Sequence, residues 1–348
     1  MGSNNTDVKN NESKIIFVGD GNNQIGENSG PVNVFGSDKS RITKNEGVVS
    51  IIGSTNEIIY NNGKNSPVAI VGNNNSDVTG NKNKAKVNVY GNGNSTIARN
   101  EEDSVITVLG DNNKDINENS GSVSIVGNNN TGVQSNKNLV IVGHNNEDIR
   151  NVSDTFILAS NVINVQSNSV VLGNASAGKA VTEVSNQEMA GTTYNFAGVA
   201  SQDNGSVSVG AEGKERQIHY VAAGEVSATS TDAVNGSQLH AAYQDIKLND
   251  ARISNMETKV DRINGRIDVL NKQIHAAGAT SMAMGNLVQA YRPGQNSTTV
   301  ALGHYGDASA IAFGLSTVAD DSKWGAKISF AANTESEFGA GAGLGYFW

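Results

Sequence analysis

The chain has 348 residues with a formal net charge of −9, no cysteine, 39 glycines and 3 prolines. Without cysteine it has no thiol nucleophile, disulfide or thiolate metal site. The negative charge disfavours nucleic-acid binding, which depends on clustered Lys and Arg. The opening stretch MGSNNTDVKNNESK has no apolar core of a secretory signal, so we expect residues 1–13 to be a disordered leader. No apolar run reaches the roughly 20 residues of a membrane-spanning helix.

Apolar tetrads that end in glycine, such as IIFVG, VSIIG and VAIVG, dominate the next segment. Between successive tetrads lies an Ile or Val that is followed three residues later by Asn, as in Val78 with Asn81. Val and Ile suit strands, while Gly and Asn accept the positive φ of tight turns. The pattern predicts a parallel β-solenoid over residues 14–218, in which each rung has two short strands and the asparagines form turns and an exposed rim. The tetrad glycines are spaced 16–19 residues apart: Gly19, Gly36, Gly53, Gly72, Gly91, Gly110, Gly127 and Gly143.

The residue before each of these glycines is always apolar. Strand alternation would place it on the outer face of the solenoid, beside polar residues such as Ser50 and Asn88. An apolar row on an outer face calls for a partner, so we interpret it as a packing surface between chains. The row consists of Val18, Phe35, Ile52, Val71, Tyr90, Leu109, Val126 and Val142.

Heptads follow over residues 239–275, where they predict a coiled-coil helix. β-Branched residues dominate position a and Ile263 occupies a d position, a combination that favours three or more strands over two. Asn249 at position d would fix the register at some cost in stability. Position a holds Leu239, Ile246, Ile253, Val260, Ile267 and Ile274, and position d holds Ala242, Asn249, Met256, Ile263 and Leu270.

Four runs of alternating residues begin near residue 296, each close to the roughly 9–11 residues of a transmembrane β-strand. The last run, FGAGAGLGYFW, places Phe338, Leu344 and Tyr346 on one face and glycines on the other. The apolar face suits a lipid bilayer. The glycine face has no bulky side chains, which suggests tight packing against another element. Four strands cannot close a membrane barrel, since known barrels start at about 8 strands, and an open edge in lipid is not viable. Three chains would supply 12 strands around the preceding helices.

With these features the chain resembles the trimeric autotransporter adhesins, the YadA-like proteins of type V secretion. SVVLGNAS resembles their head repeat, SVSVGAEGKERQI with VAAGEVSATSTDAVNGSQL resembles their head-to-neck motif, and YRPGQ with the terminal strands resembles their membrane anchor. The resemblance implies a homotrimer with a left-handed parallel β-roll head, a neck over residues 219–238, a coiled-coil stalk and an anchor over residues 276–348. That anchor would form a 12-stranded barrel in the bacterial outer membrane, with residues 296–348 in the bilayer. Trp348 would be the C-terminal aromatic that the outer-membrane assembly machinery recognises.

The resemblance further implies a cell-surface adhesin whose head binds a host-cell surface protein. The Asn/Lys-rich repeats and short stalk are similar to fusobacterial adhesins that bind the CEACAM family of human receptors. Phe35, Tyr60 and Tyr90 are the aromatic candidates for receptor contact, although packing between chains remains open for Phe35 and Tyr90. Asn249 matches core asparagines that hold a chloride-like anion on the three-fold axis. The alternative function is a surface-shielding or serum-resistance trimer without a host-cell receptor.

No motif points to catalysis, a metal or another cofactor. The five histidines are scattered without metal-ligand spacing, and no Ser, His and acid form a nucleophile motif. GDGNN lacks the third glycine and the following helix of a phosphate loop. An enzyme built on a solenoid would need a groove of acidic and basic residues, for which the sequence gives no sign.

Overall fold

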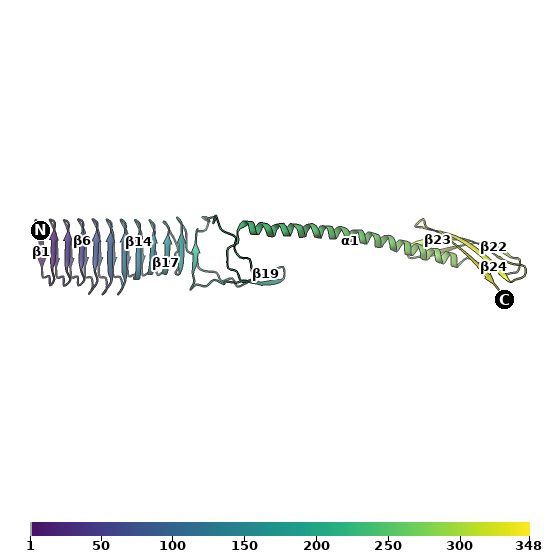
Figure 1. The fold of residues 1–348 in the computed structure, drawn as a ribbon, viewed down its shortest axis with the longest axis horizontal. Coiled ribbons are helices and arrows are strands. Elements are labelled where there is room, and N and C mark those ends of the chain that lie inside the picture. Colours follow the sequence, from purple (N-terminus) through teal and green to yellow (C-terminus); the bar gives the residue numbers. More distant parts are fainter. Residues whose placement is uncertain (1) are drawn as a thin grey trace. The chain divides into compact units, whose positions relative to one another are not determined.

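The computed structural model describes residues 2–348, which form two compact units divided between Asn235 and Gly236. Unit 1 is a parallel β-solenoid in which the chain alternates between two sheets (Figure 1). The first sheet contains β1 (Thr6–Lys9), β3 (Asn23–Gly26), β5 (Ser40–Thr43), β7 (Glu57–Tyr60), β9 (Ser76–Thr79), β11 (Ser95–Ala98), β13 (Lys114–Asn117) and β15 (Thr131–Gln134). The second contains β2 (Ile15–Val18), β4 (Val32–Phe35), β6 (Val49–Ile52), β8 (Val68–Val71), β10 (Lys86–Tyr90), β12 (Val105–Leu109), β14 (Ser120–Val126), β16 (Lys137–Val142), β17 (Ser153–Leu158), β18 (Ser169–Leu172) and β21 (Ser206–Ser208).

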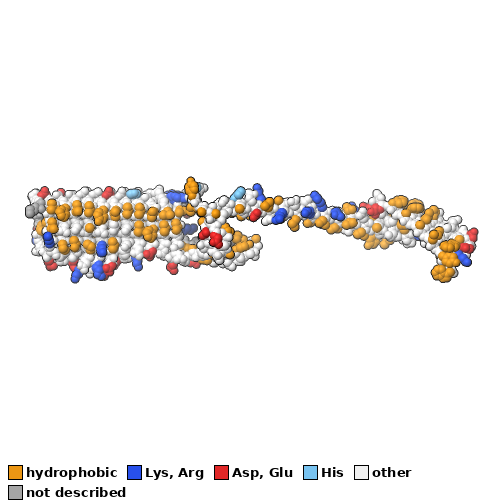
Figure 2. Space-filling view, in the orientation of Figure 1, with side chains coloured by type: hydrophobic (Ala, Val, Ile, Leu, Met, Phe, Trp, Pro, Cys, Tyr) orange, Lys and Arg blue, Asp and Glu red, His pale blue; other side chains and the backbone are white. Residues whose placement is uncertain are grey.

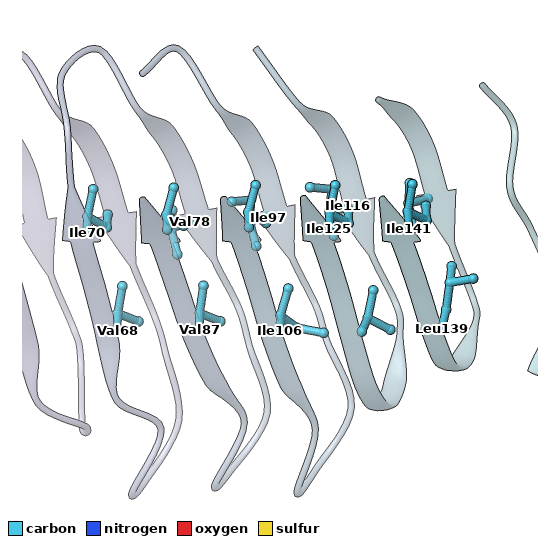
Figure 3. Packing of buried hydrophobic residues seen from close by; sticks show 14 of the residues in the cluster. Val68, Ile70, Val78, Val87, Ile97, Ile106, Ile116, Ile125, Leu139 and Ile141 are labelled. Carbon is cyan, nitrogen blue, oxygen red and sulfur yellow. The ribbon is translucent and has the colours of Figure 1, made fainter. Parts of the chain in front are cut away.

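The solenoid core consists of columns of Val, Ile and Leu that continue from rung to rung (Figure 3). Val87 lies opposite Val68 on one side and Ile106 on the other, and all three side chains are at most 1% exposed. Burying one such side chain contributes about 1.5–3 kcal/mol to the stability of the fold. A single rung cannot gain this energy by itself, because its apolar side chains are buried only when neighbouring rungs cover them. The head is therefore stable as a stack of rungs, as the tetrad repeat predicts.

Residues 6–9 belong to the segment expected to be a disordered leader, yet they form β1, which pairs in parallel with β3. Val8 lies opposite Ile25 and is followed three residues later by Asn11, which repeats the spacing seen in later rungs. The solenoid therefore includes a rung within the predicted leader.

The regular rungs end after β18. A two-stranded antiparallel hairpin, β19 (Asn186–Met189) with β20 (Thr192–Asn195), lies between β18 and β21, and the sequence pattern did not predict it. Its side chains are exposed on both strands. β21 then pairs with β18 and closes the second sheet.

Unit 2 consists of one helix and a four-stranded antiparallel sheet. Helix α1 (Gly236–Gly285) includes all the predicted heptads and continues 10 residues past residue 275. The sheet contains β22 (Asn296–Tyr305), β23 (Ala308–Val318), β24 (Trp324–Asn333) and β25 (Phe338–Tyr346), which follow one another as neighbours. Its two outer strands, β22 and β25, each pair on one side only. Within residues 2–348, no helix combines the length and the hydrophobicity that a membrane crossing requires.

Candidate functional site

The predicted outer apolar row lies exposed along the second sheet of the solenoid. Its members from Val18 to Val142, together with Leu158 in the next rung, have exposed fractions of 39–53%. Phe35 and Tyr90 both belong to this row, and Tyr90 lies between Val71 and Leu109 in the strand register. Hydrophobic side chains accordingly form straight rows along unit 1 (Figure 2). A continuous row of this kind is typical of a packing surface, where each side chain contributes by burial against a partner.

Tyr60 lies apart from that row, at the end of β7 in the first sheet. Its half-buried ring lies under two cationic side chains, with the Arg41 guanidinium 5.4 Å and the Lys44 ammonium 5.6 Å from the ring centroid. Both distances fall within the range of cation–π attraction. The structure thus groups Phe35 with Tyr90 and places Tyr60 in a separate aromatic and basic cluster.

Two ladders of buried asparagines run through the solenoid, and the expectation that the asparagines form an exposed rim is wrong for them. In each ladder the Oδ1 of one Asn accepts from the backbone N–H or the Nδ2 of the Asn in the next rung, and most Nδ2 atoms also donate to a backbone carbonyl. Buried carboxamides are stable here because their donors and acceptors are matched. The first ladder includes Asn56, Asn75, Asn94, Asn113, Asn130 and Asn146, and the second includes Asn28, Asn45, Asn62, Asn81, Asn100, Asn119 and Asn136.

Lys39 occupies the position of an asparagine in the first ladder, between Asn22 and Asn56. Its side chain is fully buried, and Nζ has no hydrogen-bond partner among the described residues. Burial lowers the pKa of the Lys39 ammonium to about 8. A Cβ atom at Gly36 would lie 3.0 Å from this Nζ, much as one at Gly72 would lie 3.2 Å from Asn75 Nδ2. Lys39 Nζ therefore takes the place of an asparagine Nδ2 in the ladder. Lysine has no side-chain oxygen, however, that could accept a hydrogen bond from Asn56.

The stalk helix presents its heptad side chains to solvent in the single chain. The a and d residues from Leu239 to Ile274 include Ile246 and Met256, whose side chains are 62% and 65% exposed. Asn249, the predicted anion ligand, is exposed on the same helix. An apolar stripe of this length is typical of a helix that packs against further helices.

The end of the helix packs against the inner face of the sheet through very small residues. Ala276, Ala279 and Ala283 are fully buried against inner-face alanines of β23 and β24. A Cβ atom at Gly303 would lie 2.2 Å from the Ala279 carbonyl oxygen and 2.5 Å from the Ala283 nitrogen. The prediction that the face with small side chains packs tightly against another element is confirmed, and that element is the chain's own helix.

The opposite face of the sheet is apolar and exposed, with Leu302 73% and Phe313 53% exposed. At one end of the sheet Trp324 and Tyr346 meet edge to face, with ring centroids 5.0 Å apart. At the other end the helix residue His275 pairs through Nδ1 with the Asp307 carboxylate at 2.6 Å. Unit 2 therefore combines an apolar outer face with an inner face fixed to the helix.

Comparisons with known proteins agree with the predicted resemblance. Residues 288–348 match the family described as the YadA-like membrane anchor domain, and residues 217–261 match the coiled stalk of trimeric autotransporter adhesins. The resemblance inferred from the sequence is thereby confirmed, whereas the CEACAM part of it stays a prediction.

Relatives are similar over parts of the chain. The autotransporter adhesin EhaG of Escherichia coli O157:H7 is 30% identical over 50% of this chain and 11% of its own length. The autotransporter adhesin BtaE of Brucella suis is 58% identical over 16% of this chain and 7% of its own length. The trimeric autotransporter adhesin AtaA of an Acinetobacter strain is 30% identical over 53% of this chain and 6% of its own length. The chain therefore spans well under a fifth of each of these relatives.

The solved C-terminal YadA-like domain of a Burkholderia pseudomallei protein is also similar, with 34% identity and a TM-score of 0.25. The match covers 30% of this chain and 51% of that one.

Proposed function

We propose that this chain is a bacterial surface adhesin that works as a homotrimer, anchored in the outer membrane and exported by its own C-terminal segment. The observation that carries the proposal is the sheet of unit 2, which has an apolar outer face and two open edges, β22 and β25. An open sheet edge is not viable in lipid, so such a sheet can span a bilayer only when other copies complete it.

Three copies of the chain would complete the open sheet and would cover the apolar surfaces of the stalk helix and the head. They supply 12 strands, above the roughly 8 that the smallest barrels need. The three helix ends would then fill the lumen, each against its own glycine and alanine face. The β-branched a positions of the stalk, together with Ile263 at a d position, favour three or more chains. In the head, the outer apolar rows of three left-handed rolls would pack together.

The head would bind a protein on the host-cell surface, and no catalytic step is part of the proposed function. Support comes from the adhesin relatives. By resemblance the receptor belongs to the CEACAM family. Tyr60 is the candidate contact residue that lies outside the outer apolar row. The outer-membrane assembly machinery would recognise the end of β25 with Trp348.

Bacteria that display the full chain test this function directly. They should adhere to cultured human epithelial cells in larger numbers than the same bacteria without the chain. Cells engineered to express or lack CEACAM receptors decide the finer proposal, because adhesion should follow the receptor. Equal adhesion with and without the chain would contradict the adhesin function, and improved serum survival in that case would favour the shielding trimer.

A further inference from the structure

Three consecutive rungs of the solenoid have a longer corner than the others. Between the second-ladder asparagine and the next core strand position, residues 63–67, 82–86 and 101–105 provide five residues, whereas residues 29–31 and 120–122 provide three. The added pair accounts for the 19-residue spacing of these rungs against 17 for their neighbours. Because the same strands and ladders stack with three-residue corners, the scaffold does not require the longer ones.

The longer corners share one fixed geometry. In each, a backbone N–H closes a turn onto the carbonyl three residues earlier: Ser66 onto Gly63 at 3.1 Å, Ala85 onto Lys82 at 3.1 Å, and Ser104 onto Glu101 at 3.2 Å. The closing residue of each turn is buried. The residue before it is exposed and has a positive φ: Asn65, Lys84 and Asp103. The three corners thus form a regular projection, which we call the charged ledge.

Charge changes sign along the ledge. Lys64, Lys82, Lys84 and Lys86 lie in its first two corners, and Glu101, Glu102 and Asp103 lie in its third. Lys82 Nζ pairs with Glu101 at 2.5 Å, and Lys84 Nζ lies 3.3 Å from Glu102 and 3.6 Å from Asp103. All of these side chains are at least 42% exposed. Exposed ion pairs contribute about 0–1 kcal/mol to stability, so stability does not explain why the ledge is present.

We propose that the charged ledge is the surface through which the head recognises its partner, and that the partner is a folded protein with basic and acidic groups in the complementary order. This inference rests on the proposed adhesin function and deepens it. Four basic and three acidic side chains lie in the ledge, so it has no field of a single sign. Polyanions and anionic lipid surfaces are bound by such single-sign fields, whereas patterned charge selects a protein partner.

Tyr60 supports this assignment because it adjoins the ledge. β7 ends at Tyr60 and leads directly into the first long corner. Tyr and Arg are enriched among the residues that contribute most of the binding energy at protein interfaces. Arg41 and Lys44 hold the ring from the preceding rung, which leaves it pre-positioned.

Two variants of the full chain, displayed on bacteria, test the proposal. The shortened variant replaces residues 63–67, 82–86 and 101–105 with the Ser-Gly-Ser sequence of residues 120–122. The swapped variant keeps every backbone position and carries Lys82→Glu, Lys84→Glu, Glu101→Lys and Glu102→Lys, with Asp103→Asn to remove the remaining acid. Glutamate is acceptable at residue 84 despite its positive φ, since Glu27 and Glu118 adopt the same conformation. The swap preserves the pairing and reverses its direction.

The probes are cultured human epithelial cells, either untreated or treated with trypsin. Wild-type bacteria should adhere to untreated cells and lose adhesion to trypsin-treated cells. Both variants should reach the surface as trimers in wild-type amounts and adhere at least ~10-fold less, as expected for a central contact repeated three times. Wild-type adhesion by the swapped variant, or adhesion that survives trypsin, would overturn the proposal. A wild-type chain that does not mediate adhesion would instead contradict the adhesin function itself.

Discussion

The Oδ1 of Asn56 accepts two hydrogen bonds from Asn75 in the next rung, one from its backbone N–H and one from its Nδ2, each at 3.0 Å. Asn75 Nδ2 also donates to the Gly91 carbonyl at 2.8 Å. This unit repeats along the ladder, so each carboxamide satisfies groups of the rungs before and after its own.

Asn94→Ala should therefore lower the free energy of unfolding of the head by at least about 2–4 kcal/mol. The substitution deletes side-chain bonds to Asn75, Asn113 and Gly110, and it removes the Asn94 partner of the buried Asn113 backbone N–H and of the Gly110 carbonyl. Urea denaturation of the purified chain, followed by circular dichroism, measures the loss. Asn88→Thr is the matched control, since Asn88 lies outward on β10 opposite Thr107 and should change stability by less than about 0.5 kcal/mol.

Lys39→Asn should stabilise the head at neutral pH, because it restores the missing ladder oxygen and removes a buried ammonium. The lysine pKa is about 8 in the folded chain, against 10.5 as the ordinary value. Below pH 8 the lysine is protonated in both states, and the burial penalty is complete. Between pH 8 and 10.5 the unfolded chain binds more protons, so wild-type stability rises with pH, by about 3 kcal/mol in total.

Denaturation of the wild type and of Lys39→Asn at several pH values from 6 to 10.5 separates this contribution from other titrations. The advantage of the variant should be largest below pH 8 and should shrink above it. A difference between the two proteins that stays constant with pH would show that Lys39 does not titrate within the head.

The sequence predicted the rungs, the outer row and the helix because each follows a simple apolar period. It did not predict the ladders, because period-2 alternation assigns polar residues to the surface, and a buried Asn is stable only beside its own counterpart in the next rung. Two signals were available: the constant offset of Asn56, Asn75 and Asn94 three residues after a tetrad glycine, and the Asn three residues after an Ile or Val, as in Val78 with Asn81. Strands of the first sheet also carry a left-handed residue, such as Ile58 with φ 54°, which interrupts alternation. The ledge was visible only as a change in repeat length.

Gly303→Ala should prevent assembly of the anchor. The added Cβ would meet backbone atoms of Ala279 and Ala283, which cannot move without displacing the helix. We expect a loss of heat-resistant trimer and of surface-displayed chain, measured by gel electrophoresis of outer membranes and by antibody labelling of whole cells. Thr298→Ala, on the exposed face of the same strand, should keep both at wild-type levels. Normal display of the Gly303 variant would mean that the helix does not occupy the inner face during assembly.

Asn249→Ile should raise the melting temperature of the stalk and remove its dependence on chloride. At a d position of a trimer, three asparagines would surround the axis and hold a small anion between their amide groups, whereas isoleucine would fill the same layer with apolar surface. Wild-type stability should then be higher in chloride than in acetate at equal ionic strength, because an anion that binds only the folded trimer stabilises it. Thermal denaturation of both proteins in both salts measures this. A wild type that melts at the same temperature in chloride and acetate would rule out the anion, while a stabilised variant would still place Asn249 in the trimer core.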